Sequence, residues 1–467
     1  MQPDDKTDKR SRTVPFIVAA AFFMETLDGS VITTALPAIG ASFGTTALDA
    51  SVGITAYLVA MAVCVPAAGW GAQRFGARRV FAAAVGMFTF ASLLCAIAPG
   101  LWTFVAARVL QGAAAAFMSP VGRLVVLHET PKDRLIQAIG TITWPGLIGP
   151  VLGPPLGGLI VTYTSWRWIF LLNVPLGLLG IWLILKYIPK RAAEGKRPFD
   201  GLGFILTAFA LALLVQGLTQ LGEHNGGAPA ALMVALGAAC AVAAVWHARR
   251  APAPMLDLRA IKVRTFAYSV VTVGFASRIA ISASPFLLPL MFQIGFGLTA
   301  LQASVALLTY MAGNLVMKSA TTMLLTRFGF RTVLTVNSAL CAASIAACGL
   351  LSPATPWALI YPVLLITGMT RSMNFTAIST LTFADVPAEQ RAGASALSTM
   401  LQLMAMTLGV ALAAFGLSVS QGWRGAPVLG LVDFRNVWFA TALLMAISAI
   451  CAWRLPRDTG SAVAPGR

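Results

Sequence analysis

Charged residues are scarce in this sequence. Asp, Glu, Lys and Arg together make up only 10% of the 467 residues, against roughly 25% in soluble domains. Hydrophobic residues make up 58%, and apolar runs recur that reach the roughly 20 residues a helix needs to cross a bilayer. This composition excludes a soluble globular protein and predicts an all-α polytopic membrane protein.

The sequence also lacks the groups on which many enzymes and pumps depend. It holds three histidines and no G-x-x-x-x-G-K-[ST] loop, which argues against an ATP-driven pump. Its six cysteines lie in or at the ends of apolar segments and show no C-x-x-C spacing. We therefore expect small buried cysteines, no metal site, no bound cofactor, and a protein that is not an enzyme.

Fourteen apolar segments are long enough to be membrane spans. The first fifteen residues are polar and lack the features of a signal peptide, so we expect the first segment to be retained as a span. The predicted spans are 16–37, 50–70, 80–98, 102–125, 137–161, 167–188, 202–221, 229–248, 266–292, 300–325, 331–350, 356–382, 394–418 and 434–454.

Lys and Arg are distributed unevenly between the loops. With the N-terminus in the cytoplasm and alternating spans, 25 of the 33 basic residues fall in cytoplasmic segments, three in outside loops and five within spans. Basic residues concentrate in the cytoplasmic loops of membrane proteins. The net charge of +17 is thus a topology signal that requires no nucleic acid, and both termini are predicted to be cytoplasmic.

An internal repeat divides the chain. "QRFGARRVF" begins at residue 73 and "TRFGFRTVL" at residue 326, an offset of 253, and "TPKDR" and "VPAEQR" form a weaker second pair. Parallel repeats with a substrate path between the halves are a transporter architecture. We predict an N-terminal six-helix bundle at 16–188, two inserted spans within 202–248, and a C-terminal six-helix bundle at 266–454.

Two carboxylates lie inside the first predicted span, in "AAFFMETLDGSVITTALPAIG". Of the sixteen acidic residues, only Glu25 and Asp28 fall within a span, and their spacing places them on one helix face. Ionisable groups at this depth usually mark ion or substrate pathways. Because burial favours the neutral form of a carboxyl group, such a group can bind and release a proton at physiological pH. Glu25 and Asp28 are our candidates for proton coupling.

Basic residues inside spans are the natural counterparts of these carboxylates. Arg278 stands 253 residues after Glu25, and Arg371 lies beside Asn374 in "TGMTRSMNFTAIST". We expect both arginines, with Asn374 and Trp144, to line a substrate cavity and to meet anionic groups. The alternative, for these arginines and for Arg108, is a fixed counter-ion of a buried carboxylate or carbonyl.

The fifth predicted span reads "TWPGLIGPVLGPPLGGLI". Glycines permit close approach of a neighbouring helix, and prolines remove backbone donors and kink the helix. Such a helix suits a segment that rocks or seals a pathway, although glycine-rich packing also occurs in static bundles. The residues concerned are Gly149, Pro150, Gly153, Gly157 and Gly158.

Five stretches, in order, resemble motifs of the major facilitator superfamily, and specifically of its fourteen-span drug:proton antiporter branch, the EmrB/QacA type. They are "LDGSVITTALP" (27–37), "GWGAQRFGARRV" (69–80), "RVLQGAAAA" (108–116), "GPVLGPPLGG" (149–158) and "WRWIFLLNVPLG" (166–177). The resemblance implies the major facilitator fold, with two six-helix bundles and two inserted spans. It also implies multidrug efflux by alternating access, driven by proton antiport across the bacterial inner membrane, as in antibiotic resistance.

The resemblance also implies roles for individual residues. Asp28 would bind the coupling proton, while Arg108 and Gln111 would tune its protonation and gate the cycle. The loop residues Gly69, Arg74, Gly76 and Arg78 would form a cytoplasmic gate. Gln73 and Ala77 depart from the aspartate and arginine usual in that loop. Glu25 lies outside the motif; we expect it to share the coupling proton or to meet cationic substrates, and coupling to Arg278 is an alternative that the sequence leaves open.

Other functions remain compatible with the residues. One is proton-coupled transport of a single endogenous metabolite or nutrient, although the fifth-span motif favours export. Another is a membrane receptor or scaffold without transport, which the intramembrane charges and the repeat disfavour. The expected partners are amphipathic small molecules and the lipid bilayer, and no motif identifies a periplasmic adaptor.

Overall fold

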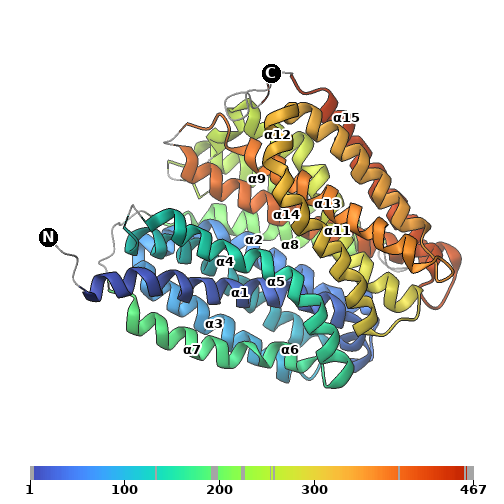
Figure 1. The fold of residues 1–467 in the computed structure, drawn as a ribbon, viewed down its shortest axis with the longest axis horizontal. Coiled ribbons are helices and arrows are strands. Elements are labelled where there is room, and N and C mark those ends of the chain that lie inside the picture. Colours follow the sequence, from blue (N-terminus) through green and yellow to red (C-terminus); the bar gives the residue numbers. More distant parts are fainter. Residues whose placement is uncertain are drawn as a thin grey trace. The chain divides into compact units, whose positions relative to one another are not determined.

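The computed structural model describes residues 5–131, 134–190, 198–221, 227–252, 254–255, 258–387, 390–456 and 459, and these residues form helices and connecting turns without a β-strand (Figure 1). The chain divides into two compact units, unit 1 at Met1–Phe204 and unit 2 at Ile205–Arg467. The expectation of an all-α protein is confirmed.

Seven helices make up unit 1. They are α1 (Asp5–Ser42), α2 (Ala47–Phe75), α3 (Ala77–Ile97), α4 (Leu101–Glu129), α5 (Leu135–Tyr163), α6 (Arg167–Leu171) and α7 (Asn173–Tyr187). The predicted sixth span, 167–188, corresponds to one membrane-length segment, Arg167–Tyr187, in which Leu172 joins α6 to α7 with a helical φ of −58° and ψ of −31°. The first helix starts well before the predicted residue 16.

Unit 2 begins within α8 and adds π-helical turns to its α-helices. Its elements are α8 (Gly201–Leu221), α9 (Gly227–Arg250), η2 (Leu258–Lys262), α10 (Arg264–Ala267), η3 (Tyr268–Thr272), α11 (Val273–Leu290), η4 (Met291–Gly295), α12 (Ala300–Leu350), α13 (Trp357–Thr382), α14 (Arg391–Arg424) and α15 (Leu431–Trp453). The π-helical elements are η3 and η4, so the predicted span 266–292 is not one regular α-helix.

Twelve helices of the described residues are long and apolar enough to cross a membrane, which makes this a multi-pass membrane protein. Fourteen spans are predicted, and the difference falls in α12 and α13. The 51-residue α12 covers two predicted spans, and α13 is less apolar because Arg371 and Asn374 interrupt it. Large side chains that are exposed, such as Trp102 at 69% and Leu443 at 66%, suit contact with lipid.

The helix α12 folds back on itself at Gly329. Tyr310 from its first half lies against Gly368 of α13, and Cys348 from its second half lies 3.6 Å from the Thr367 hydroxyl. Along a straight helix Tyr310 and Cys348 would be about 57 Å apart. The reversal therefore occurs at Gly329. Its φ of 72° would be strained for a residue that carries a side chain, whereas glycine adopts it freely.

The sequence repeat is also a repeat of structure. Gly76, between α2 and α3, has a φ of 87° and corresponds to Gly329 at the offset of 253. Two residues after each glycine an arginine donates a hydrogen bond to a backbone carbonyl near the end of the last helix of its unit. Arg78 donates to the Leu185 carbonyl of α7, and Arg331 donates to the Trp453 carbonyl of α15 at 2.8 Å. Both units thus use one helix–turn–helix plan.

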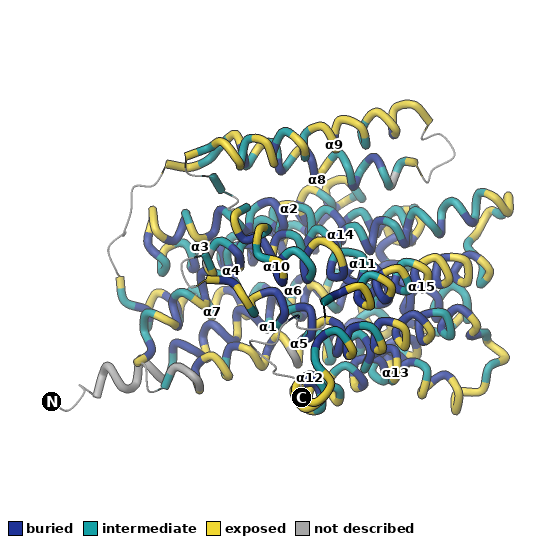
Figure 2. Tube along the Cα trace, turned by 90° about the horizontal axis from the view of Figure 1, so that it is seen from above, coloured by how far each residue is buried: buried dark blue, intermediate teal, exposed yellow. Residues whose placement is uncertain are grey.

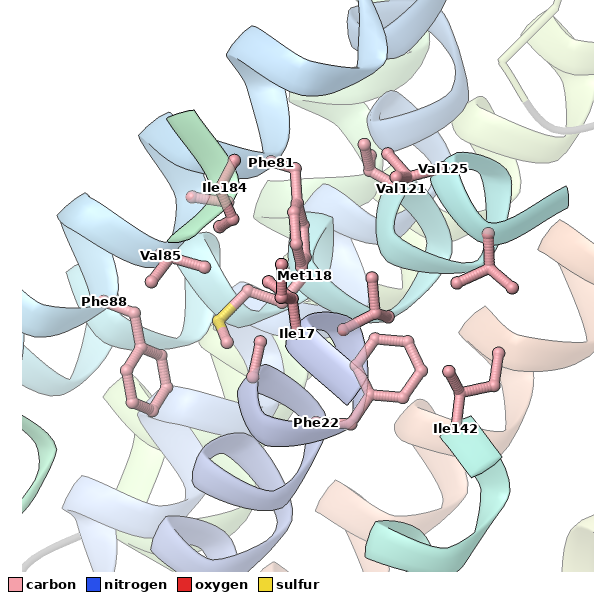
Figure 3. Close-up of a cluster of buried hydrophobic side chains, with 14 of the residues drawn as sticks. Ile17, Phe22, Phe81, Val85, Phe88, Met118, Val121, Val125, Ile142 and Ile184 are labelled. Carbon is pink, nitrogen blue, oxygen red and sulfur yellow. The ribbon is translucent and has the colours of Figure 1, made fainter. Parts of the chain in front are cut away.

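The interior of unit 1 is a cluster of apolar side chains. Figure 3 shows Phe22 of α1, Phe81 of α3, Met118 of α4, Ile142 of α5 and Ile184 of α7 converging on one another, and all are buried. Lipid is as apolar as these side chains, so close packing, rather than transfer from water, holds the helices together.

Helices α8 and α9 are packed less deeply, and α9 is largely exposed along its length (Figure 2). Two glycines bring the pair together, with Gly217 of α8 against Val234 and Gly237 of α9 against Leu214. Small residues commonly allow such close helix contacts in membranes. The two predicted inserted spans therefore form a helical hairpin.

Candidate proton-coupling site

The packing of α5 against α1 positions the predicted carboxylates. Three glycines of α5 lie one turn apart and face three hydroxyl residues of α1 with the same spacing. The facing pairs are Gly149 with Thr26, Gly153 with Ser30, and Gly157 with Thr34. A Cβ added at Gly153 would lie 1.9 Å from Ser30 Oγ. Ser30 Oγ also donates a hydrogen bond to the Gly149 carbonyl at 3.1 Å.

This contact explains the glycines of the fifth-span motif, since any side chain would separate the two helices. Gly158 is buried beside them, and Pro150 lacks the N–H that the Gly146 carbonyl would otherwise receive. Movement of α5 during a transport cycle stays a prediction. Close packing with α1 is what the structure establishes.

Asp28 lies on α1 within the packed interior of unit 1 and is 2% exposed. Its Oδ2 accepts a hydrogen bond from Arg108 Nη1 at 2.7 Å, which is also a buried ion pair. Its Oδ1 accepts from Gln111 Nε2 and from Asn173 Nδ2, each at 2.9 Å. Three donors from α4 and α7 therefore surround the carboxylate.

Arg108 is held as firmly as its partner. It is 1% exposed, and its Nε donates to the Gly53 carbonyl at 3.3 Å. Its Nη1 also donates to Gln111 Oε1 at 2.6 Å, and the guanidinium carbon stands 4.2 Å from the centre of the Tyr57 ring. Gly112 makes this possible, because any side chain there would collide with the Tyr57 carbonyl at 2.2 Å.

A serine closes the polar network. Ser92 Oγ of α3 accepts from Gln111 Nε2 at 2.8 Å and from Asn173 Nδ2 at 3.2 Å, and it donates to the Phe88 carbonyl at 2.8 Å. Buried polar groups are costly unless each finds a partner. We define the Asp28 network as Asp28, Ser92, Arg108, Gln111 and Asn173.

Glu25 lies one turn from Asp28 and is 7% exposed. Its Oε2 accepts a hydrogen bond from Ser119 Oγ of α4 at 2.8 Å, and the charge of Arg123 acts on it. The two predicted carboxylates therefore share a helix face but have different partners. Arg278 belongs to unit 2, so the alternative that it couples to Glu25 stays a prediction.

The predicted cavity residues lie in different parts of the chain. Arg278 on α11 is 2% exposed, and the Arg371 guanidinium on α13 stands 5.7 Å from the centre of the Tyr310 ring. Asn374 is fully buried and accepts a hydrogen bond from Ser338 Oγ at 3.0 Å. Trp144 on α5 is 60% exposed. A shared substrate cavity stays a prediction.

The predicted gate residues surround the turn between α2 and α3. Gly69 and Arg74 are exposed on α2, and Gly76 forms the turn itself. Arg78 at the start of α3 binds the Leu185 carbonyl of α7. This bond ties the turn to the end of unit 1, whereas opening and closing of a gate stays a prediction.

Sequence reasoning missed Ser92 and Asn173 in the Asp28 network, Ser119 beside Glu25, and the ring of Tyr57 under Arg108. Asn173 offered a signal, since it is an amide in an apolar segment within the "WRWIFLLNVPLG" motif. Ser92 and Ser119 offered none, because small hydroxyl residues are common in membrane helices. Among the described residues no group of three or more His, Cys, Asp or Glu could hold a metal ion.

Two helical units built on one repeat, with a buried ion pair inside the membrane helices of the first, define a membrane transporter. The model of the Major Facilitator Superfamily matches residues 18–410, and the chain belongs to this family. The resemblance in the motifs is thereby confirmed, and the family is one of transporters rather than enzymes.

Curated relatives are similar over nearly the whole chain. A protein of Cronobacter sakazakii named "Putative multidrug resistance protein MdtD" is 36% identical over 450 residues, covering 95% of this chain and 94% of that protein. An Escherichia coli protein of the same name is 34% identical over 457 residues, covering 97% of this chain and 96% of that protein.

Solved structures share the fold at low sequence identity. A D-xylose–proton symporter matches with a TM-score of 0.68 and 14% identity, covering 96% of this chain and 98% of that chain. The POT family transporter PepTSo matches with a TM-score of 0.66 and 14% identity, covering 94% of this chain and 97% of that chain. These similarities establish the fold of the chain.

Proposed function

We propose that the protein is a proton-coupled antiporter that exports amphipathic small molecules from bacteria by alternating access. The observation that carries this proposal is the Asp28 network, a buried carboxylate held by Arg108, Gln111 and Asn173. The relatives named as multidrug resistance proteins support the substrate class. The motif similarities support the drug:proton antiporter branch.

The chemistry of the network supports proton coupling at Asp28. Binding of a proton removes the negative charge, so the ion pair with Arg108 is lost while the guanidinium remains charged. A buried charge without its partner is costly, so a protonated site favours a different arrangement of α1 and α4. In this proposal Arg108 and Gln111 link protonation to the conformational change, and Glu25 shares the proton or binds cationic substrates.

The remaining predicted residues complete the proposal. Trp144, Arg278, Arg371 and Asn374 contact the substrate, the α5 motif lets the helix rock against α1, and the turn at Gly76 closes the cytoplasmic side. Transport of one endogenous metabolite by the same mechanism is the second candidate. Buried Arg278 of unit 2 favours it, since a fixed charge suits a defined substrate.

Proteoliposomes with an acidic lumen and a trapped pH dye test the function. Three probes share one ring system and differ in permanent charge: naphthalene-2-sulfonate, (2-naphthylmethyl)trimethylammonium and 2-naphthalenemethanol. With ethidium as a fourth compound, we expect at least one to accelerate collapse of the pH gradient over protein-free liposomes. Equal rates for every compound with and without protein would contradict proton-coupled export of amphipathic molecules.

We also propose fourteen spans with both termini in the cytoplasm. The reversal of α12 at Gly329 supports two spans in that helix, and α13 at 26 residues is long enough for another. A reporter fused within 223–229 should be periplasmic, and one within 190–198 should be cytoplasmic; both insertion sites lie largely outside the described residues. Cytoplasmic signals from both fusions, measured with paired phosphatase and fluorescent reporters, would remove α8 and α9 from the spans.

A further inference from the structure

Unit 2 contains two arginines, Arg278 and Arg371, with buried nitrogen atoms that have no carboxylate partner among the described residues. Arg278 is 2% exposed, and its Nε and Nη1 have no hydrogen-bond partner among the described residues. The Nε of Arg371 is likewise buried and without a partner there. In the described part of unit 2 the acidic residues are Asp385, in the turn after α13, and Asp433, which binds Arg424 and Ser420.

The helix packing brings Arg278 to the level of Asn374, with Arg371 one turn further along α13. Gly274 of α11 lies against Ile378 of α13, since a Cβ there would stand 3.0 Å from Ile378 Cγ2. The chain reverses after α11, again at Gly329 and again before α13, so α13 runs antiparallel to α11. One turn onward from Gly274 is Arg278, and one turn back from Ile378 is Asn374, with Arg371 a further turn along the same face.

Further unused donors lie at this level. Asn374 accepts from Ser338 through Oδ1, while its Nδ2 is buried without a partner among the described residues. The hydroxyl groups of Ser277 and Ser372, each beside one of the arginines in sequence, are also buried and unpaired there. Donors and positive charge accumulate here without an acceptor.

We propose that Arg278, Arg371 and Asn374 form a recognition site for an oxyanion carried by the exported molecule. The inference rests on the proposed function for the identity of the molecule as an export substrate. Guanidinium groups bind carboxylate, sulfonate and phosphate oxygens through paired charge-assisted hydrogen bonds, and the Asn374 amide adds a neutral donor. A bound oxyanion satisfies the unused donors.

Calorimetry on the purified protein in detergent tests the site with the naphthalene probes. We expect naphthalene-2-sulfonate to bind at least about tenfold more tightly than the trimethylammonium probe, because hydrogen bonds to a charged group carry about that much selectivity. Equal affinities, or tighter binding of the cation, would overturn the proposal.

Variants locate the binding. Arg371→Gln should raise the Kd of naphthalene-2-sulfonate about tenfold or more and leave that of 2-naphthalenemethanol unchanged. Asn374→Asp should lower the affinity for naphthalene-2-sulfonate and narrow its advantage over the trimethylammonium probe, since the new carboxylate competes for the arginine donors. Arg278→Lys retains a positive charge at that buried position and loses only the paired donors of the guanidinium. It should therefore weaken sulfonate binding less than Arg371→Gln does. Arg327→Gln, at an exposed position of α12, is the matched control and should change nothing.

The source of the oxyanion is tested in nanodiscs. Sulfonate affinity should be the same in phosphatidylcholine with and without phosphatidylglycerol, and competition by the anionic lipid would show that a headgroup occupies the site instead. The two experiments distinguish failure of the proposed function from failure of the site. Sulfonate binding without any compound-dependent proton flux would contradict export but not the site. Proton flux with the cation, without sulfonate binding, contradicts the site but not export.

Discussion

Asp28→Asn is expected to reduce proton-driven transport in proteoliposomes to the rate of protein-free liposomes. The amide has the size of the carboxyl group but cannot bind and release a proton at physiological pH. It also cannot offer Arg108 a negative charge, so the pair at 2.7 Å is lost and a buried guanidinium is stranded. Breaking a buried pair in this way typically costs about 3–5 kcal/mol, so a lower thermal midpoint is also expected.

Two further variants separate chemistry from stability. Adding Arg108→Gln to Asp28→Asn removes the stranded charge, so the thermal midpoint should recover in large part while transport stays absent. Asp49→Asn makes the same chemical change at the exposed N-terminal turn of α2 and should leave transport intact. Full proton-driven transport by Asp28→Asn would exclude Asp28 as the coupling residue.

Gly153→Ala should have the largest effect of any methyl group added to α5. Its Cβ would stand 1.9 Å from Ser30 Oγ and 3.2 Å from the Val31 backbone nitrogen, so α5 must move away from α1. Overpacking of this kind costs about 1–3 kcal/mol or more, and it would be measured as a fall of the thermal midpoint together with lower transport.

Ser30→Gly should rescue this variant in part, because it removes both the hydroxyl and the Cβ that the new methyl group meets. Gly146→Ala is the matched control on the same helix, since nothing lies within 4 Å of a Cβ built there. Equal thermal midpoints for Gly153→Ala and Gly146→Ala would show that α1 and α5 are not packed closely at this level.

The parts of this molecule that could be predicted from the sequence are those that the bilayer constrains. Apolar length located the membrane helices, because unsatisfied backbone groups exclude other structures from hydrocarbon. Asp28 could be selected as a candidate because charges inside spans are rare and must be compensated, and the motif resemblance placed Arg108 near it. The repeat located Gly76 and Gly329, since both turns need a residue without a side chain.

The parts that could not be predicted depend on neighbours distant in sequence. Ser92 and Asn173 join the network only because α3 and α7 pack beside α4, and neither carries a charge that marks it. The π-helical turns η3 and η4 could not be predicted either, because Gly274, Pro289 and Gly295 lie in or near them but such residues are common in membrane helices. The sequence also could not show that nitrogen atoms of Arg278 and Arg371 are buried without a hydrogen-bond partner among the described residues.

The shared plan of the two units has a consequence for how such a protein diversifies. A duplicated bundle keeps its frame wherever backbone geometry requires it, as at Gly76 and Gly329 or at Tyr57 and Tyr310. The polar content is free to diverge on that frame: 253 residues after Glu25 stands Arg278, and 253 residues after Asp28 stands Ile281. At these two positions the first unit carries carboxylates and the second an arginine and an isoleucine, so substitutions can change the polar side chains of one unit while the turns of both are kept.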